Sequence, residues 1–222
     1  MIEHIEPGIL PPNKKACIAL TSWKKRINTV GLTIFNLVTT CGPDYHIVLT
    51  LAEEEFPRKE RELPRDLVLM NRVGLFEILW VKKNWKSFKK WIFTGLKYSS
   101  VPIITADDDV IYTCDYASGL FDSYMHNKKH KIITWINSIN SGQGILIEPS
   151  NICSRLVSKL NNMPLLSIDS CMCAYITKYR IDTLSLKRER CTIQHTNVAP
   201  INMAQYNNLE QYKIIQLYQS KV

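Results

Sequence analysis

The chain has 222 residues, which suits a single domain, and its 45% hydrophobic content is enough to build a core. Its 28 basic and 20 acidic residues give a net charge of +8, which favours an anionic partner: a nucleotide phosphate, a nucleic acid or an acidic membrane surface. No run of residues approaches the ~18 apolar residues of a membrane span.

Cysteine usage points to a reducing compartment. The seven cysteines are an odd number, none forms a CxxC pair, and several lie inside apolar stretches, as small buried hydrophobes do. The acidic segment 1–7 lacks the apolar centre of a signal peptide. We therefore expect reduced thiols in a cytoplasmic protein, with peripheral association at the inner membrane face as an option.

Strand and helix patterns alternate through the first half of the chain. Helices are expected after Asn28–Thr29 and after Asn84, an acidic helix or loop at 53–55, and buried strands at 15–20, 45–51, 76–81 and 101–106. This alternation predicts an α/β fold with a mostly parallel sheet and right-handed crossovers. Ligands bind such sheets beyond the carboxyl ends of the strands, where we expect Thr21–Ser22, Trp80–Val81 and Asp107.

The helix expected after Asn84 combines an apolar stripe with four lysines. The stripe consists of Phe88, Trp91, Ile92 and Leu96, and the lysines are Lys86, Lys89, Lys90 and Lys97. These lysines fit a solvated helix face. Their position just ahead of the strand at 101–106 also favours a phosphate contact for one or two of them.

The second half is less regular. Strands are expected at 131–136 and 144–147, with a glycine loop at 140–144 between them. Helical patterns follow Pro149 and Asp169, and a further approximate helical phase runs through the tail from 204 to 221. There are no repeats and no clear linker, so we expect one domain over 1–222.

Three consecutive aspartates, Asp107, Asp108 and Asp109, follow the apolar run 101–106 and precede Val110 and Ile111. Carboxylates this close repel one another, and burying several without a counter-charge is costly. A strand that delivers three to one point therefore indicates a divalent cation, Mg²⁺ or Mn²⁺, held with the phosphates of a substrate. The alternative is a solvated acidic turn after an edge strand.

These pieces resemble small bacterial glycosyltransferases of the GT-A fold that build surface polysaccharides. The matching segments are Leu20–Ile27, Leu49–Pro57, Lys86–Lys90 and Ile104–Tyr112, with the glycine loop and Asp169 following at plausible distances. The resemblance implies a GT-A-like single domain: a nucleotide-sugar-binding half at 15–115, a mixed acceptor half at 116–200 and a helical tail at 201–222. It also implies transfer of a hexosyl-type sugar from a nucleotide-diphosphate sugar to a glycan or lipid-linked acceptor, with Mn²⁺ or Mg²⁺.

The resemblance also implies roles for individual residues. Asp109 would bind the metal, Asp107 would contact the ribose or support the site and also act as a metal ligand, and Asp108 would take part in binding the nucleotide-sugar donor. The donor would be approached by Thr21, Arg26, Lys86 and Lys90, while Gly142 and Gly144 would let the backbone come close to sugar and acceptor.

Two later residues carry open assignments. Asp169 stands where the family often has two adjacent acids before a helix, and here only one remains, in Ile168–Asp169–Ser170. It is either the general base on the acceptor hydroxyl or a helix N-cap. His195 is either a late metal ligand from a C-terminal loop or a structural histidine.

Two other functions compete with glycosyl transfer. A sugar-nucleotide nucleotidyltransferase can share this sheet, but it expects a glycine-rich phosphate loop after the first strand, and Thr21–Arg26 contains no glycine. A basic nucleic-acid-binding module would explain the net charge of +8 but not an acidic triplet at the focus of the sheet. We therefore expect no nucleic-acid partner.

Overall fold

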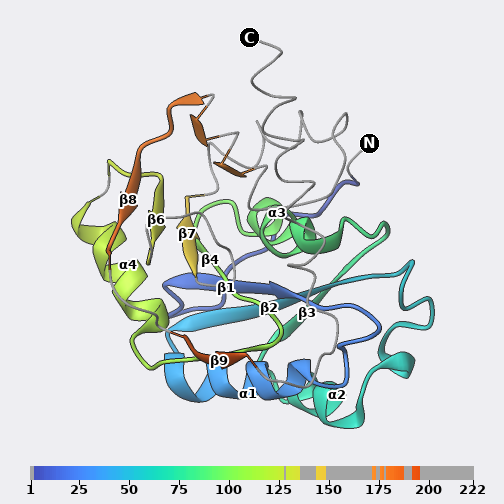
Figure 1. Cartoon of the computed structure of the whole chain (residues 1–222). Coiled ribbons are helices and arrows are strands. Elements are labelled where there is room, and N and C mark those ends of the chain that lie inside the picture. The colour runs from blue at the N-terminus through green and yellow to red at the C-terminus, as the bar shows by residue number, and fades with distance from the viewer. Residues whose placement is uncertain are drawn as a thin grey trace.

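The computed structural model describes residues 3–127, 129–135, 144–148, 172–173, 176–177, 179–187 and 192–195 (Figure 1). In chain order the elements are β1 (Ala16–Thr21), α1 (Val30–Cys41), β2 (Tyr45–Ala52), the 3-10 helix η1 (Lys59–Glu62), α2 (Arg65–Arg72), β3 (Glu77–Val81), the 3-10 helix η2 (Lys86–Phe88), α3 (Lys89–Lys97), β4 (Ile103–Thr105), β5 (Val110–Tyr112), α4 (Tyr116–His126), β6 (Ile132–Thr134), β7 (Ile145–Ile147), β8 (Thr183–Ser185) and β9 (Thr192–His195). No helix among the described residues is long and apolar enough to span a bilayer.

A seven-stranded sheet in the order β3-β2-β1-β4-β7-β6-β8 forms the centre of the fold. Strands β3, β2, β1 and β4 are parallel to their neighbours. Strand β7 is antiparallel to both β4 and β6, and β8 is parallel to β6. This confirms the predicted α/β fold with a mostly parallel sheet, whose all-parallel half comes first in the chain.

The strand order reverses at β1. The chain runs outward from β1 through β2 to β3 and then returns to add β4 on the other side of β1. The connections that follow β1, into α1, and β4, into β5 and α4, pack into the same core on one face of the sheet. In open α/β sheets, ligands bind beyond the carboxyl ends of the strands where the strand order reverses. The end of β1 carries Thr21 and Ser22, and the end of β4 leads into Asp107.

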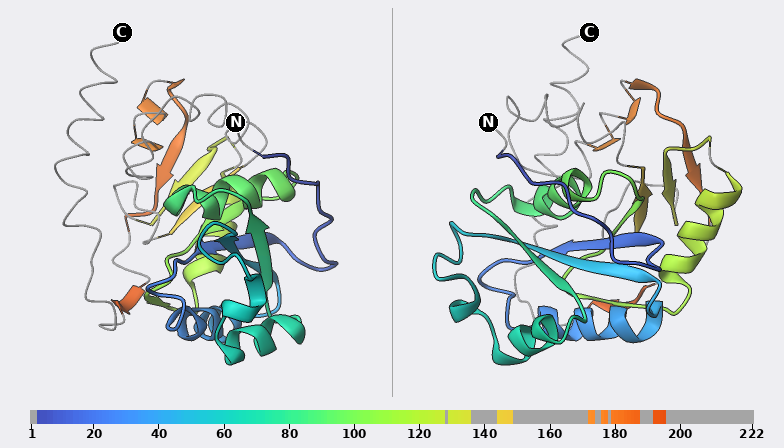
Figure 2. Two further views of the ribbon diagram at one scale, coloured as in Figure 1. Left: turned by 90° about the vertical axis from the view of Figure 1, so that its right-hand side faces the viewer. Right: turned by 180° about the vertical axis from the view of Figure 1, so that it is seen from behind.

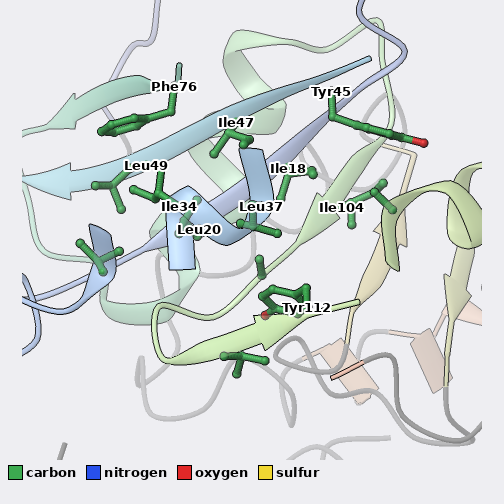
Figure 3. Packing of buried hydrophobic residues seen from close by; sticks show 14 of the residues in the cluster. Ile18, Leu20, Ile34, Leu37, Tyr45, Ile47, Leu49, Phe76, Ile104 and Tyr112 are labelled. Atoms are coloured by element: carbon green, nitrogen blue, oxygen red, sulfur yellow. The ribbon is translucent and has the colours of Figure 1, made fainter. Parts of the chain in front are cut away.

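Helices cover both faces of the parallel half. Figure 1 shows α1 and α2 below the sheet and α3 above it, and the two views of Figure 2 agree. Successive residues of a strand point to opposite faces, so β1 sends Ile18 and Leu20 to one core and Cys17 and Ala19 to the other. In Figure 3, Ile18 and Leu20 lie with Ile34 and Leu37 of α1 in the first of these cores.

The predicted helices and strands of the first half are present, with shifts at their ends. Helix α1 begins at Val30, and Thr29 takes the N-cap position without a side-chain cap bond, its Oγ1 donating instead to the Arg26 carbonyl at 2.9 Å. Asn84 accepts the Lys86 N–H at 2.9 Å and so opens the 3-10 turn η2, and α3 follows from Lys89.

The lysines in and just before α3 do not all lie on a solvent-exposed helix face. Lys89 and Lys90 are each only 1% exposed, whereas Lys86 is exposed. Long cationic side chains are rarely buried without a partner, and both of these lysines have carboxylate partners, described below. The pattern of charged and apolar residues does not reveal the burial of these lysines, because a lysine in a buried ion pair cannot be told from an exposed lysine by sequence.

The second half agrees with prediction where it is described. Strands β6 and β7 fall within the segments expected at 131–136 and 144–147. Residues 172–173 and 176–177 are helical, within the helix expected after Asp169. The helix expected after Pro149, the tail at 204–221, Gly142 and Asp169 lie outside the described residues.

A polar cluster ties α3 to the amino ends of β2 and β3. The Glu77 carboxylate is 2.8 Å from His46 Nε2, 2.5 Å from Lys97 Nζ and 2.5 Å from the Tyr98 hydroxyl that donates to it. Burial acts to raise the pKa of Glu77, but the bonds from His46, Lys97 and Tyr98 outweigh burial and lower that pKa to about 2.

Glu77→Gln should therefore destabilise the protein by about 1–3 kcal/mol at pH 7, because the bonds to a charged acceptor are lost. A carboxylate with a depressed folded-state pKa contributes stability above its unfolded pKa and loses it as pH falls through the folded pKa. The stability gap between wild type and variant should thus be full above about pH 4.5 and shrink toward pH 2. Urea unfolding across this range measures it, with exposed Glu6→Gln as the control; a gap independent of pH contradicts the prediction.

Candidate active site

The acidic triplet lies in the turn between β4 and β5. Strand β4 is interior, between β1 and β7, so the alternative of a turn after an edge strand is wrong. The turn projects beyond the carboxyl end of β4 next to the end of β1, because Ala106 N–H donates to the Ala19 carbonyl at 2.9 Å. The triplet thus stands at the edge of the sheet where the strand order reverses, the place where open α/β sheets bind ligands.

Asp108, the middle acid, points into the protein. Its residue is 5% exposed, and its carboxylate accepts bonds from Ser22 Oγ at 2.6 Å and from Arg26 at 2.8 Å. Thr33 Oγ1 of α1 donates to the Asp108 carbonyl at 3.2 Å. Burial raises the pKa of Asp108, and the bonds from Arg26 and Ser22 oppose that rise. Asp108 therefore fastens the β4–β5 turn to the loop between β1 and α1.

The outer two acids remain accessible to different extents. The Asp107 side chain is 38% exposed, and its Oδ1 is 2.5 Å from Lys90 Nζ. The Asp109 side chain is 15% exposed, and its Oδ2 is 2.9 Å from Arg26. Carboxylate oxygens are the donors that Mg²⁺ and Mn²⁺ prefer, so Asp107 and Asp109 fit such an ion.

Arg26 is the cation shared by two of the acids. It bridges Asp108 and Asp109, and its side chain is 13% exposed. Burial acts to lower the pKa of Arg26, but Asp108 and Asp109 outweigh it and the net shift is upward. The neighbouring Lys24 and Lys25 are exposed, and Lys24 pairs with Glu62 at 3.2 Å. Of the basic run, only Arg26 forms an ion pair with the acidic turn among the described contacts.

The two buried lysines approach the carboxyl ends of the strands from the opposite face. Lys90 pairs with Asp107, and Lys89 Nζ lies 2.9 Å from Glu55 Oε2 and 2.8 Å from Asn84 Oδ1. Burial lowers the pKa of Lys89, and Glu55 acts against that shift. Sequence analysis placed Ser22 at this edge of the sheet and Lys89 among the lysines favoured for a phosphate contact, but it gave Glu55 no role. The position of Glu55 just after a strand was the available signal.

Tyrosines hold the backbone of the turn. The Asp107 N–H donates to the Tyr112 hydroxyl at 2.7 Å, and the Tyr116 hydroxyl donates to the Thr105 carbonyl. Asn36 of α1 binds both the N–H and the carbonyl of Tyr112, at 2.7 and 3.1 Å. Each end of the acidic turn is therefore fixed by side chains from helices.

Other predicted site residues have defined surroundings. Thr21 Oγ1 donates to the Thr50 carbonyl at 2.6 Å, which commits that proton to strand β2. Lys86 is exposed and has a positive φ of 50°. Gly144 has a φ of +95°, and a Cβ there would lie 2.6 Å from Tyr116 Cε2, so this position requires glycine for conformation and for packing.

A strand pairing brings a distant segment to the triplet. Strand β9 pairs antiparallel with β5, and His195 is the register partner of Val110, the residue after Asp109. Figure 1 shows β9 next to α1, below the seven-stranded sheet. The His195 side chain lies outside the described part of the chain, so its role as a ligand stays a prediction.

No group of three or more His, Cys, Asp or Glu side chains among the described residues is arranged to hold a metal ion. Two accessible carboxylates are nevertheless typical of magnesium-type sites, in which one or two acids and the substrate phosphates share the coordination. The residues present thus fit a cation that arrives with a phosphate ligand better than one enclosed by protein.

Comparison with known proteins identifies the fold class. No protein-family model matches the chain, and no curated protein matches it. Among solved structures, the chain is similar to the mannosyltransferase PcManGT from Pyrobaculum calidifontis in complex with GDP-Man and Mn²⁺, with a TM-score of 0.51 and 10% identity over 82% of this chain and 56% of that one. It is also similar to the glycosyltransferase GlyE of Streptococcus pneumoniae TIGR4, with a TM-score of 0.50 and 13% identity over 79% of this chain and 46% of that one.

These similarities confirm the predicted GT-A-like α/β fold. The chain spans about half the length of the solved structures it matches. At such low identity the likeness concerns the fold, and function has to be argued from the site.

Asp108→Ala should cost about 3–5 kcal/mol of folding stability, because it removes the buried partner of Arg26 and Ser22. Asp109→Ala removes the same charge from the same turn but leaves Arg26 paired with Asp108, so its cost should be at least ~2 kcal/mol smaller. Urea unfolding of the two variants at pH 7 measures the difference. Equal costs would show that Asp108 is not the structural member of the triplet.

Proposed function

We propose that this protein is a metal-dependent glycosyltransferase that moves a sugar from a nucleotide-diphosphate sugar to a glycan or lipid-linked acceptor. The observation that carries the proposal is the pair of accessible carboxylates, Asp107 and Asp109, at the strand-order reversal of a GT-A-like sheet. The similarity to solved glycosyltransferases, one of them with GDP-Man and Mn²⁺, supports the choice of reaction.

The proposed division of labour follows from the contacts. Asp107 and Asp109 would hold Mn²⁺ or Mg²⁺ on the donor diphosphate, and a cation there stabilises the charge that develops on the leaving group. Arg26 and Lys90 lie next to these acids and would face the same phosphates. Asp108 would support the site from within by fixing Arg26.

The remaining residues take peripheral roles in the proposal. Lys86, exposed at the start of η2, would approach the nucleotide, and Thr21 would line its pocket through the end of β1. Gly142 and Gly144 would border the sugar and acceptor side. Asp169 would be the base in an inverting reaction, and His195 would add a late metal ligand.

A hexosyl donor, an acceptor in surface-polysaccharide synthesis and a cytoplasmic place at the inner membrane face complete the proposal. They rest on the sequence resemblance and the net charge of +8. The nucleotidyltransferase alternative requires a glycine-rich loop after β1. In this chain that loop has no glycine, and its Ser22 and Arg26 bind Asp108. The nucleic-acid alternative would require backbone phosphates to bind at the edge of the sheet that carries Asp107 and Asp109, whose charges repel them.

Asp109→Ala should lower metal-stimulated release of nucleoside diphosphate from GDP- or UDP-sugars by at least ~100-fold. The reason is that Asp109 would act on the metal and contributes less to packing than Asp108. Asp122→Ala, which removes one exposed acid of α4, is the charge-matched control and should keep full turnover. Full metal-stimulated turnover by Asp109→Ala would remove the metal-site hypothesis.

Asp169→Asn separates the base from the cap. If Asp169 is the base, the kcat of Asp169→Asn should be ~10²–10⁴-fold below that of wild type. Donor binding and melting temperature should be nearly unchanged, since Asn also caps helices well. Steady-state kinetics with thermal unfolding measure both. Normal turnover of Asp169→Asn, with a loss of ~1 kcal/mol in Asp169→Ala, would identify a cap.

A further inference from the structure

Exposed apolar side chains are concentrated on the solvent side of α1 and α2. Eight large hydrophobic residues are exposed among the residues that the structure describes, and five of them belong to α1, α2 and the turn after α2. Single exposed hydrophobics are ordinary on a protein surface, whereas a concentration of them on one face marks an interaction site. The five residues are Leu32, Phe35, Leu69, Val73 and Leu75.

The contact between the two helices brings these side chains together. Helices α1 and α2 lie side by side below the sheet in Figure 1, and Figure 2 agrees. A Cβ on Gly31 of α1 would lie 3.1 Å from Asp66 Oδ2 and 3.5 Å from Met70 Cε of α2. Phe35 follows Gly31 by one helical turn and is 58% exposed. Val73 follows Met70 by one turn and is 71% exposed, so both side chains stand beside the helix junction and in solvent.

Basic residues border this apolar face. Helix α1 has no charged residue. On α2, Arg65 and Arg72 are exposed, and they lie four residues before and three residues after Leu69, on the same side of the helix. Segments 24–25 and 58–72 together carry seven basic residues and three acids, so positive charge is in excess around the apolar side chains.

We propose that the α1–α2 face, made of the five apolar residues together with Arg65 and Arg72, binds the surface of a bilayer that contains anionic phospholipids. Its apolar side chains would enter the boundary between headgroups and acyl chains, and its arginines would meet lipid phosphates. A second copy of the chain fits this face less well. A two-fold interface sets the same patch of each copy against itself, so the basic residues would repel one another.

The α1–α2 face adjoins the proposed active site. Thr33 Oγ1 donates to the Asp108 carbonyl at 3.2 Å, so the first turn of α1 lies against the acidic turn. Lys24, two residues before Arg26, pairs at 3.2 Å with Glu62, just before α2. The basic border thus runs from the loop of Arg26 to the start of α2. The inference rests on the membrane location in the proposed function, and a lipid-linked acceptor in the same bilayer would be presented beside the site.

The test measures binding of the full chain to vesicles by co-sedimentation, with no donor sugar and no metal present. One set of vesicles contains equal parts of phosphatidylglycerol and phosphatidylcholine, and the other contains phosphatidylcholine alone. We expect the wild type to bind the anionic vesicles at least ~10-fold more tightly than the neutral ones. Added salt should weaken this binding, because it screens the attraction between arginines and headgroups.

Two double variants separate the apolar contribution from the charge contribution. Phe35→Gln with Val73→Gln removes two exposed apolar side chains and should weaken binding to anionic vesicles at least ~10-fold. Arg65→Gln with Arg72→Gln removes two charges and should weaken the same binding at least ~5-fold. Glutamine is a good helix former, and circular dichroism with melting temperature checks the fold of each variant.

Matched double variants elsewhere on the surface serve as controls. Ile9→Gln with Met125→Gln removes two exposed apolar side chains from the N-terminal segment and α4. Lys82→Gln with Lys83→Gln removes two exposed charges from the turn after β3. Both controls should bind anionic vesicles within about twofold of the wild type, because they lie outside the α1–α2 face.

A wild type that binds anionic vesicles no better than neutral ones, or binds neither, overturns the membrane surface. Equal losses in the control variants and in the α1–α2 variants also overturn it. If the wild type ignores vesicles but forms a dimer that Phe35→Gln with Val73→Gln dissociates, the face serves self-association instead. Failure of the proposed reaction gives a different pattern: no nucleoside diphosphate is released from any GDP- or UDP-sugar with Mn²⁺, while binding to anionic vesicles persists.

Discussion

The buried contact of Asp108 with Ser22 and Arg26 determines the geometry of the whole site. It joins the loop after β1 to the turn after β4, at the point where the strand order reverses. Because the middle acid of a tight turn points inward, its two neighbours turn toward the outer side. A run of three aspartates thus contains one structural anchor and two outer carboxylates, which are the metal ligands of the proposed function.

Charge balance at this point comes from elements far apart in the chain. The acids follow β2 and β4, while the cations come from the β1–α1 loop and from α3 on the opposite face of the sheet. Lys89 and Lys90 are nearly inaccessible, and burial of such groups is tolerated only with a partner. The acidic turn and α3 therefore stabilise each other, and the site is preorganised only in the folded chain.

Sequence alone predicted the parallel half of the sheet because each strand is a continuous apolar run and each helix has a clear period. It also located Asp107 and Thr21–Ser22 near one edge, since strand ends gather there, and the family resemblance added Arg26. It could not separate the inward Asp108 from its neighbours, nor recognise Lys89 and Lys90 as buried, because both depend on partners over 15 residues away. The β5–β9 pairing that carries His195 to Val110 has no local signal either.

The same balance decides which ligand suits the site. Among the described ion pairs, Asp107, Asp108, Asp109 and Glu55 face Arg26, Lys89 and Lys90, which leaves one formal negative charge within this set. That excess attracts a lone divalent cation weakly, and it repels a lone diphosphate at the acids while attracting it at the cations. Under the proposed function, a metal bound to a diphosphate would satisfy both sets at once, since the metal would meet Asp107 and Asp109 and the phosphate oxygens would meet Arg26 and Lys90. Within the proposed function, the electrostatics of these side chains therefore favours a metal–nucleotide complex over either component alone.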